Sequence, residues 1–314
     1  MEGNEKLLTI LNQSLSKINK IMTKNSNNRS IFFNFIIISV AVIGLAKPAY
    51  SQSAESDSSF HPYHVNYWVS GSIIGVGAVA NILGIPESQN KNVISPFELQ
   101  TLNKSIINNI DSWALKQDPS KMAAFENNSA YALVSSVVLP AMLMFDKRIR
   151  HDWINILIMY AETMSITTNI YEWSFLGPTF QNKFRPITYY DQVTYDQKKA
   201  GTNRNSFYSG HVAVAAAATF FMAKVFCDYN PGIGNNKYLI YGAATIPPLI
   251  LGLFRVKALM HFPSDVMVGL GVGALVGIII PELHHLPERN MSLGVFSTHE
   301  STGIAITWQP NFLK

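Results

Sequence analysis

The sequence predicts an all-α protein, a bundle of six helices that is embedded in a membrane or associated with one. Charged residues make up only 14% of the chain, against the ~25% usual in soluble domains, while hydrophobic residues make up 48%. Six apolar segments also approach the ~20 residues that a helix needs to cross a bilayer. These segments are 65–85, 130–146, 152–172, 207–226, 237–254 and 263–281.

The positive charge of the chain gathers at its N-terminus. Residues 1–51 hold six basic side chains, with only Glu2 and Glu5 as acids. Basic and acidic residues balance in the rest of the chain, which argues against a nucleic-acid-binding surface. Cys227 is the single cysteine, so an internal disulfide and a multi-cysteine zinc site are excluded.

Residues 1–51 are expected to form a signal peptide or an N-terminal anchor. The apolar run 31–46 follows a basic stretch and is shorter than the ~20 residues of a full membrane span. Ala49 and Ser51 supply the small residues that a signal peptidase prefers just before its cleavage point. An uncleaved membrane anchor is the alternative, and both interpretations direct the chain to the membrane or beyond it.

Three regions are predicted after this leader. Residues 52–129 would hold the first helix and an amphipathic helix over 93–126, where apolar residues recur at helical spacing. Residues 130–290 would form the core, and 291–314 a C-terminal tail. Apolar and small or polar residues alternate over 303–308, which predicts a short strand.

Three polar clusters lie at the ends of consecutive predicted helices. They occupy residues 183–186, 206–211 and 255–265. In an up-down bundle the end of one helix and the start of the next share a face. We therefore expect all three clusters to converge on one rim, as a functional site requires.

Each cluster suits an oxyanion such as phosphate. Arg185 and Arg255 offer planar guanidinium groups that stay charged at physiological pH. Gly210 permits a close backbone approach at the start of a helix, where the helix dipole favours an anion. Asp265 follows His261 by four residues, so its carboxylate is expected to reach one imidazole nitrogen and to strengthen the other as a nucleophile.

At these positions the sequence resembles the superfamily of type 2 phosphatidic acid phosphatases (PAP2) and vanadium haloperoxidases, which includes lipid phosphatases and bacterial acid phosphatases. Its motifs are Lys-x6-Arg-Pro, Pro-Ser-Gly-His and Ser-Arg-x5-His-x3-Asp. The chain matches them, in order, with Arg185-Pro186, Ser209-Gly210-His211 and Arg255-x5-His261-x3-Asp265. The resemblance spans roughly 150–285 and implies that the core over 130–290 is a PAP2-like phosphatase core.

The resemblance implies a role for each matching residue. His261 would attack phosphorus and form a phosphohistidine, with Asp265 orienting it. His211 would protonate the leaving oxygen and later activate water. The residues that would hold the phosphate oxygens are Arg185, Arg255, Ser209 and Gly210. No metal and no cofactor is implied.

The chain departs from these motifs at three positions. Pro178 stands where the family's lysine is expected, Tyr208 replaces the proline of the second motif, and Phe254 replaces the serine of the third. Lys183, just before the Arg-Pro pair, is the candidate to supply the missing ammonium to the phosphate.

The predicted activity is that of a hydrolase removing a terminal phosphate from a lipid phosphate or prenyl diphosphate in a membrane. Two alternatives stay open. A vanadium-dependent haloperoxidase would place vanadate in the same pocket, and a catalytically inactive PAP2-like envelope protein would explain Pro178. The substrate within the lipid class is not encoded in a motif, because scattered apolar contacts would select it.

The predicted location is the cell envelope, in the inner membrane or the periplasm. Lys147, Arg148 and Arg150 crowd one short turn between apolar segments, which the positive-inside rule places in the cytoplasm. The candidate site would then face the periplasm. A cleaved leader followed by six full spans would place it in the cytoplasm instead, so the number of spans stays open.

Three further ionisable residues are expected to be structural. Glu162 lies within an apolar segment, where an acid is expected to pair with another group in the interior. His284 and His285 look like part of a zinc site, but no third ligand lies near them in the sequence. Solvated side chains at a helix end are expected for this histidine pair.

Overall fold

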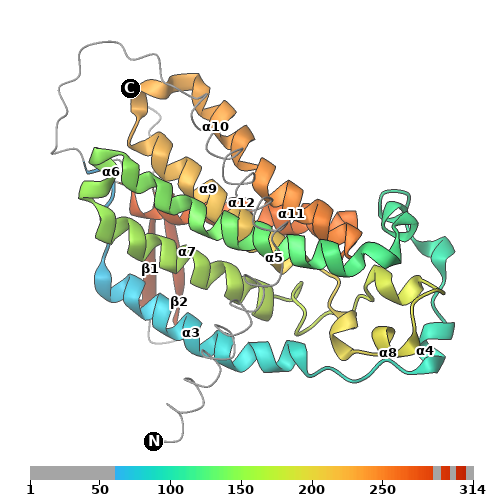
Figure 1. The fold of residues 1–314 in the computed structure, drawn as a ribbon. Coiled ribbons are helices and arrows are strands. Elements are labelled where there is room, and N and C mark those ends of the chain that lie inside the picture. Colours follow the sequence, from blue (N-terminus) through green and yellow to red (C-terminus); the bar gives the residue numbers. More distant parts are fainter. Residues whose placement is uncertain (1–60, 286–290, 298–301, 309–314) are drawn as a thin grey trace, which may run out of the picture.

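A computed structural model describes residues 61–285, 291–297 and 302–308 of the chain (Figure 1). The predicted all-α fold is confirmed, with one β-hairpin after the last helix. The leader predicted over 1–51 lies outside the described residues, as do the first residues of the predicted region 52–129.

Long helices correspond to the six predicted apolar segments. They are α3 (Tyr67–Gln89), α5 (Met122–Val138) with the 3-10 helix η4 (Leu139–Phe145), α7 (Trp153–Trp173), α9 (Gly210–Asp228), α10 (Lys237–Ala244) with α11 (Ile246–Lys257), and α12 (Pro263–His284). The fifth segment is divided into two helices. Pro247 and Pro248 follow the break, and a proline has no N–H with which to continue the hydrogen bonds of α10.

Helix α9 forms the centre of the bundle. Most of its residues are buried, and a run of alanines keeps its surface smooth. Helices α12, α7, α11 and α5 all pack against it (Figure 1). Because α9 begins at the second motif cluster, this central packing fixes the position of that cluster relative to the other helices.

Glycines on α12 allow it to lie directly against α9. A Cβ atom added at Gly273 would come within 2.0 Å of the Ala213 carbonyl oxygen, and one at Gly277 within 2.5 Å of the Ala217 carbonyl oxygen. Glycines spaced by four residues lie on one face of a helix and let two backbones approach closely. The spacing of the two helices therefore depends on these positions.

Replacing Gly273 by Ala should destabilise the protein by about 1–3 kcal/mol, because the added methyl group must push α12 away from the α9 backbone. The measurement is thermal unfolding of the detergent-solubilised protein. Gly271→Ala is the matched control, since nothing lies within 4 Å of a Cβ atom at Gly271 on the same helix. Equal midpoints for the two variants would contradict this account of the helix packing.

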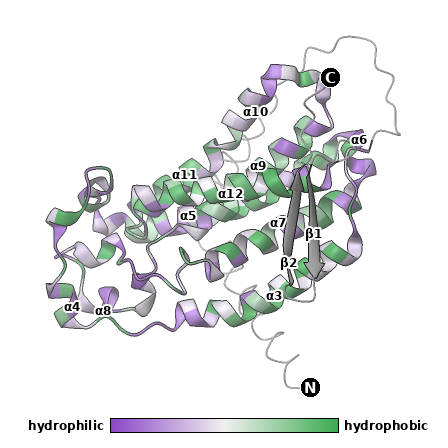
Figure 2. Cartoon of the chain, turned by 180° about the vertical axis from the view of Figure 1, so that it is seen from behind, coloured by the Kyte–Doolittle hydropathy of each residue, from purple (hydrophilic) through white to green (hydrophobic). Residues whose placement is uncertain are grey.

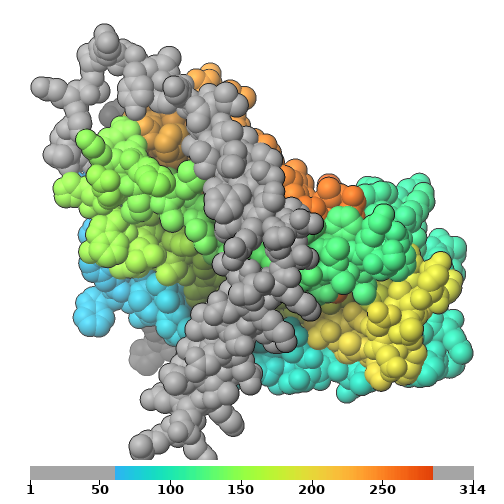
Figure 3. Space-filling view, in the orientation of Figure 1, coloured from blue at the N-terminus to red at the C-terminus, as the bar shows by residue number. Residues whose placement is uncertain are grey.

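Short elements gather at one end of the bundle (Figure 1). They are α4 (Pro96–Gln100), η1 (Lys104–Ile106), η2 (Asp111–Lys116), η3 (Pro119–Lys121), η5 (Pro186–Tyr189), α8 (Tyr195–Lys198) and η6 (Gly201–Arg204). The segments before α5 and between α7 and α9 lie side by side there (Figure 3). Ion pairs join them, from Lys104 to Asp191 and from Arg204 to Glu98.

The prediction of one amphipathic helix over 93–126 is wrong, because short helices and turns occupy this segment. Side-chain oxygens of Asn103, Asn108 and Asp118 each accept a hydrogen bond from a backbone N–H two or three residues ahead. Such local bonds compete with the hydrogen bonds of a continuous helix. The apolar spacing was helical, but the polar residues between the apolar ones favour turns.

Five helical stretches among the described residues are long and apolar enough to cross a membrane. They are Tyr67–Gln89, Pro119–Phe145, Gly210–Asp228, Pro231–Lys257 and Pro263–His284. Apolar residues run along these helices (Figure 2), and Trp68 on α3 is 89% exposed. Helices of this number, length and apolar composition are typical of a membrane protein. Helix α7 is not one of the five, although its segment was predicted as a span.

The other end of the bundle holds α6 (Lys147–His151) and the β-hairpin (Figure 1). Strand β1 (Met291–Ser297) pairs antiparallel with β2 (Thr302–Trp308), so the strand predicted in the C-terminal tail is confirmed. The predicted boundary between residues 129 and 130 falls inside α5, and the division of the chain into regions stays a prediction.

Candidate active site

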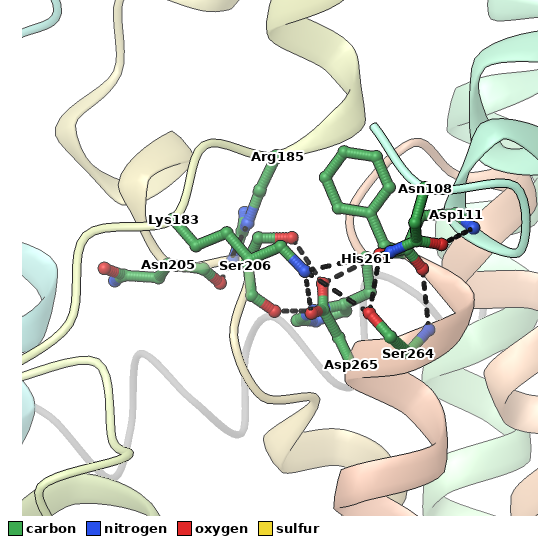
Figure 4. A network of polar contacts seen from close by, with 10 residues as sticks. Asn108, Asp111, Lys183, Arg185, Asn205, Ser206, His261, Ser264 and Asp265 are labelled. Atoms are coloured by element: carbon green, nitrogen blue, oxygen red, sulfur yellow. Dashed lines mark hydrogen bonds and ion pairs between the residues drawn. The ribbon is translucent and has the colours of Figure 1, made fainter. Parts of the chain in front are cut away.

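The three motif clusters meet where the bundle joins the short elements (Figure 4). Arg185 directly precedes η5, and Arg255 lies in the last turn of α11. His261 follows in the loop before α12, whose first residue is Pro263, as the sequence predicts. The second cluster leads into α9, with Gly210 as its first helical residue.

Asp265, in the first turn of α12, contacts residues of all three clusters, and we call it the hub. Its side chain is fully buried. One carboxylate oxygen accepts from Lys183 Nζ at 2.6 Å, and the other accepts from Ser206 Oγ at 2.6 Å and from the Phe262 N–H at 2.9 Å. Its backbone carbonyl accepts from the Ser209 N–H at 3.1 Å. One residue thereby holds loops from all three motifs.

His261 is held in a single tautomer. Its side chain is only 1% exposed, and Nδ1 lies 2.6 Å from the Ser206 carbonyl oxygen. A carbonyl oxygen can only accept, so Nδ1 carries the proton and Nε2 keeps its lone pair. Nε2 lies 3.5 Å from Arg255 Nη2. The nitrogen able to act as a nucleophile therefore faces the guanidinium group.

The environment also keeps His261 neutral. Burial lowers its pKa well below the usual range for histidine, and the positive charges of Arg255 and Arg185 lower it further, against a smaller opposing effect of the Ser206 hydrogen bond. A lowered pKa means that the imidazole loses its proton at a lower pH than usual. At neutral pH the Nε2 lone pair is consequently available.

The expectation that Asp265 bonds directly to His261 is wrong. The Ser206 carbonyl occupies the position on Nδ1, and the carboxylate of Asp265 bonds instead to the Ser206 hydroxyl. The helix start places the carboxylate over the Phe262 N–H, which turns it away from the imidazole. Asp265 thus reaches His261 only through Ser206.

Several donors in the pocket are available to an anion. Arg255 is 5% exposed, and its Nη1 makes only a long contact of 3.4 Å with Ser129 Oγ. Arg185 Nη1 faces the Met260 sulfur at 3.3 Å. Within the described part of the chain, Arg255 Nε and Ser209 Oγ are buried without a hydrogen-bond partner. Buried donors of this kind fit the oxygens of a bound phosphate.

His211 differs from His261 in its exposure. It is the second residue of α9, and its side chain is exposed, whereas His261 is buried. Both imidazoles interact electrostatically with Arg255 and Arg185, so they belong to the same site. An exposed imidazole beside a buried one suits a group that exchanges protons with a leaving group and with water.

Lys183 does not reach the arginines through any contact in the described chain. Its ammonium pairs with Asp265 at 2.6 Å and lies 3.7 Å from Asp111 Oδ2. It also lies over the rings of Phe262 and Phe207, at 4.7 and 5.6 Å from their centroids. Its role as a phosphate ligand stays a prediction. Through Asp265 and Ser206 it is connected to the Nδ1 side of His261.

Gly210 has a packing role in addition to its predicted contact with phosphate. A Cβ atom at this position would come within 2.8 Å of the Tyr171 ring. Tyr208, which stands where the motif has proline, is fully buried and packs edge-on against the same ring at 5.4 Å between centroids. The tyrosine pair therefore fills the space behind the second motif.

Sequence reasoning missed Ser206, Asp111 and Ser264, which the structure adds to the site. Ser206 holds His261 through its carbonyl, and Asp111 accepts hydrogen bonds from both the N–H and the hydroxyl of Ser264. Ser206 stood inside a quoted cluster but matched no motif position. Asp111 is far away in sequence, and its spacing carries no signal of its own.

The prediction that Glu162 pairs structurally is confirmed, because its carboxylate contacts His284 Nε2 at 3.0 Å. The expectation of a solvated His284 is wrong, since its side chain is 13% exposed. Both residues lie toward the end of the bundle where α12 finishes, away from His261. No group of three residues able to hold a metal ion occurs in the described ranges.

Comparisons with known proteins bear on the part of the chain that carries the three clusters. Residues 155–288 match the family model described as the PAP2 superfamily. No curated protein matches the chain. Among solved structures, the chain is similar to the first transmembrane PAP2-type phosphatidylglycerolphosphate phosphatase from Bacillus subtilis, with 17% identity and a TM-score of 0.34, covering 81% of this chain and 93% of that chain. The match over 155–288 contains every matching residue of the three clusters, so this part of the chain is similar to the PAP2 superfamily.

Proposed function

We propose that the chain is a phosphohydrolase that removes a terminal phosphate from a lipid phosphate or a prenyl diphosphate. The observation that carries the proposal is the arrangement of His261. Its proton is held on Nδ1 by a carbonyl, and its Nε2 faces Arg255 in a buried pocket with further anion donors. A lone pair beside fixed positive charge is what in-line attack on a phosphate requires.

The proposed reaction has two steps. His261 Nε2 attacks phosphorus while the bond from phosphorus to the leaving oxygen breaks, and His211 gives its proton to that oxygen. Water then attacks phosphorus, with His211 taking a proton from it, while the bond from His261 Nε2 to phosphorus breaks; inorganic phosphate leaves and the lone pair returns to Nε2. Arg185, Arg255 and Ser209 would stabilise the charge on the three other oxygens throughout.

Apolar helices support a lipid as the substrate. The site lies where α9 and α12 begin, and both helices are apolar enough to cross a membrane. A phosphate on a lipid would lie at such a helix end while its chains remain among the helices. This argument supports the lipid class and does not choose a headgroup.

The test is phosphate release by the purified, detergent-solubilised protein. Phosphatidic acid, phosphatidylglycerol phosphate, undecaprenyl diphosphate and lipid A are supplied in parallel, with p-nitrophenyl phosphate as a soluble reference. We expect release from at least one of the lipids. If none of them and not even p-nitrophenyl phosphate is hydrolysed, the proposed function is overturned.

A catalytically inactive PAP2-like protein is the second candidate, and one observation favours it. The ammonium of Lys183 pairs with Asp265 and Asp111, so the family's phosphate-binding ammonium has no counterpart among the contacts of the pocket. The same assay decides between the two candidates. A haloperoxidase would instead oxidise bromide with peroxide once vanadate is added.

We also propose that the site faces the periplasm. Arg148 of α6 bonds to Asn230, just beyond the C-terminal end of α9, whereas the site lies at the N-terminal end of α9. The 1.5 Å rise per residue separates these ends by about 28 Å, close to the thickness of a bilayer core. If the basic α6 is cytoplasmic, the site lies outside.

Cysteine labelling in intact cells tests this orientation. In a Cys227→Ser background, Asp191→Cys should react with an impermeant maleimide and Lys147→Cys should not. The reverse pattern would overturn the orientation.

A further inference from the structure

We propose that Asp111 and Lys183 are positioning residues, which orient His261 through Asp265 and Ser206. The inference rests on the proposed phosphohydrolase activity and names the groups that act behind its nucleophile. It also places part of the segment before α5 in the catalytic unit, although that segment lies outside the family match over 155–288.

A continuous series of polar contacts leads from Asp111 to the nucleophile (Figure 4). Asp111 Oδ2 lies 3.7 Å from Lys183 Nζ, which contacts Asp265 Oδ1 at 2.6 Å. The second oxygen of Asp265 accepts from Ser206 Oγ at 2.6 Å, and the Ser206 carbonyl accepts from His261 Nδ1 at 2.6 Å. Every link after the first is a short hydrogen bond or ion pair.

Asp111 is positioned to fix the start of α12. It is 4% exposed, and its Oδ1 accepts from the Ser264 N–H at 2.9 Å. Its Oδ2 accepts from Ser264 Oγ at 2.7 Å and from Asn108 Nδ2 at 3.0 Å. A carboxylate at a helix N-terminus satisfies backbone donors there and is favoured by the helix dipole. Because Ser264 adjoins Asp265, this clamp limits the movement of the hub.

Lys183 also holds the hub, by its ion pair with Asp265 Oδ1. Asp265 is fully buried, and a buried carboxylate remains ionised only with a cationic or hydrogen-bonding partner. The ammonium supplies that partner, and the ring of Phe262 lies against it at 4.7 Å. The ammonium lies between two carboxylates, which offset its positive charge, and no contact joins it to Arg185 or Arg255 in the described chain.

The backbone of Lys183 supports the same arrangement. Its carbonyl accepts from the Ser206 N–H at 2.9 Å, while its side chain bonds the same carboxylate as the Ser206 hydroxyl. Ser206 is therefore held at its N–H and its hydroxyl, which fixes the direction of the carbonyl that determines the tautomer of His261. Loosening either hold should misplace the nucleophile without removing any phosphate ligand.

The experiment compares kcat, KM and the inhibition constant of inorganic phosphate for Asp111→Asn and Lys183→Met, using the wild-type substrate that is hydrolysed best. A misplacement of about 1 Å costs on the order of 10²-fold in rate. We expect kcat to fall by about that factor in each variant, with KM and phosphate inhibition nearly unchanged. The double variant should lose far less than the product of the two losses, because both residues act through Asp265.

Lys104→Met is the matched control. It removes the exposed 3.0 Å ion pair with Asp191, which also joins the segment before α5 to the segment between α7 and α9. This variant should keep the wild-type kcat. Ser264→Ala serves as a milder second probe, because it deletes one hydrogen bond to Asp111 and leaves the backbone bond in place. It should lower kcat in a protein whose unfolding midpoint stays close to wild type.

Three outcomes would overturn the inference. A raised KM and weaker phosphate inhibition at unchanged kcat in Lys183→Met would make Lys183 a phosphate ligand. The second outcome is a wild-type kcat in both Asp111→Asn and Ser264→Ala. The third is that the losses in Asp111→Asn and Lys183→Met multiply in the double variant. An inactive wild type defeats the proposed function together with the inference, whereas an active wild type with unaffected variants defeats the inference alone.

Discussion

Replacing His261 by Ala should abolish the phosphoenzyme with every substrate and reduce phosphate release by several orders of magnitude, as removal of a nucleophile does in other enzymes. The imidazole is buried, so a second variant, His261→Gln, tests whether any loss comes from a cavity instead. The measurement is phosphate release together with the unfolding midpoint of each variant. Activity near wild type in either variant would contradict the assignment.

Replacing His211 by Ala should reduce phosphate release in a different way, because only the general acid is lost. Such a group contributes typically ~10²–10⁴-fold. The loss should shrink with p-nitrophenyl phosphate, whose leaving oxygen needs little protonation, and stay large with an alkyl phosphate. Both histidine variants are therefore measured on both substrates. If the better leaving group rescues the His261 variant instead, the roles of nucleophile and acid are reversed.

Replacing Asp265 by Ala is expected to have the second largest effect, on stability as well as on activity. The change removes the acceptor for Lys183, Ser206 and Phe262 at once, all beside a fully buried position. Breaking a buried charge pair costs about 3–5 kcal/mol, and the phosphatase activity should be lost with it. Denaturant or thermal unfolding in detergent measures the first effect, and phosphate release the second.

Asp196→Ala is the control for that variant. Asp196 pairs with Lys199 at 2.6 Å, but its side chain is 81% exposed, and exposed pairs contribute only about 0–1 kcal/mol. Its unfolding midpoint should stay close to wild type. A similar midpoint for Asp265→Ala would show that Asp265 is not the hub of the three loops.

The long helices could be predicted from the sequence because each depends on an extended apolar segment. Composition alone placed α9 and α12 within a few residues of their observed bounds, and Pro263 marked the start of α12. The segment 93–126 could not be predicted in the same way. There, single side-chain hydrogen bonds, such as that from the Asp111 N–H to Asn108 Oδ1, outweigh the apolar spacing.

Part of the candidate site could likewise be predicted from the sequence, and part could not. Motif spacing predicted that Arg185, His211 and His261 would meet, because helix ends bring such clusters together. The partner of His261 could not be predicted, since a backbone carbonyl has no sequence signature. The contribution of Asp111 depends on tertiary packing across a long separation in sequence, for which a single sequence contains no pattern.

The most direct test of the account is to locate the phosphate on the enzyme during turnover. The protein is mixed with its best substrate carrying labelled phosphate, quenched at alkaline pH where phosphohistidine survives, and digested for peptide mapping. The account predicts label on the peptide containing His261, at Nε2, and none in His261→Ala. Label on His211 or on any other residue, or rapid phosphate release with no labelled enzyme at any time, would contradict it.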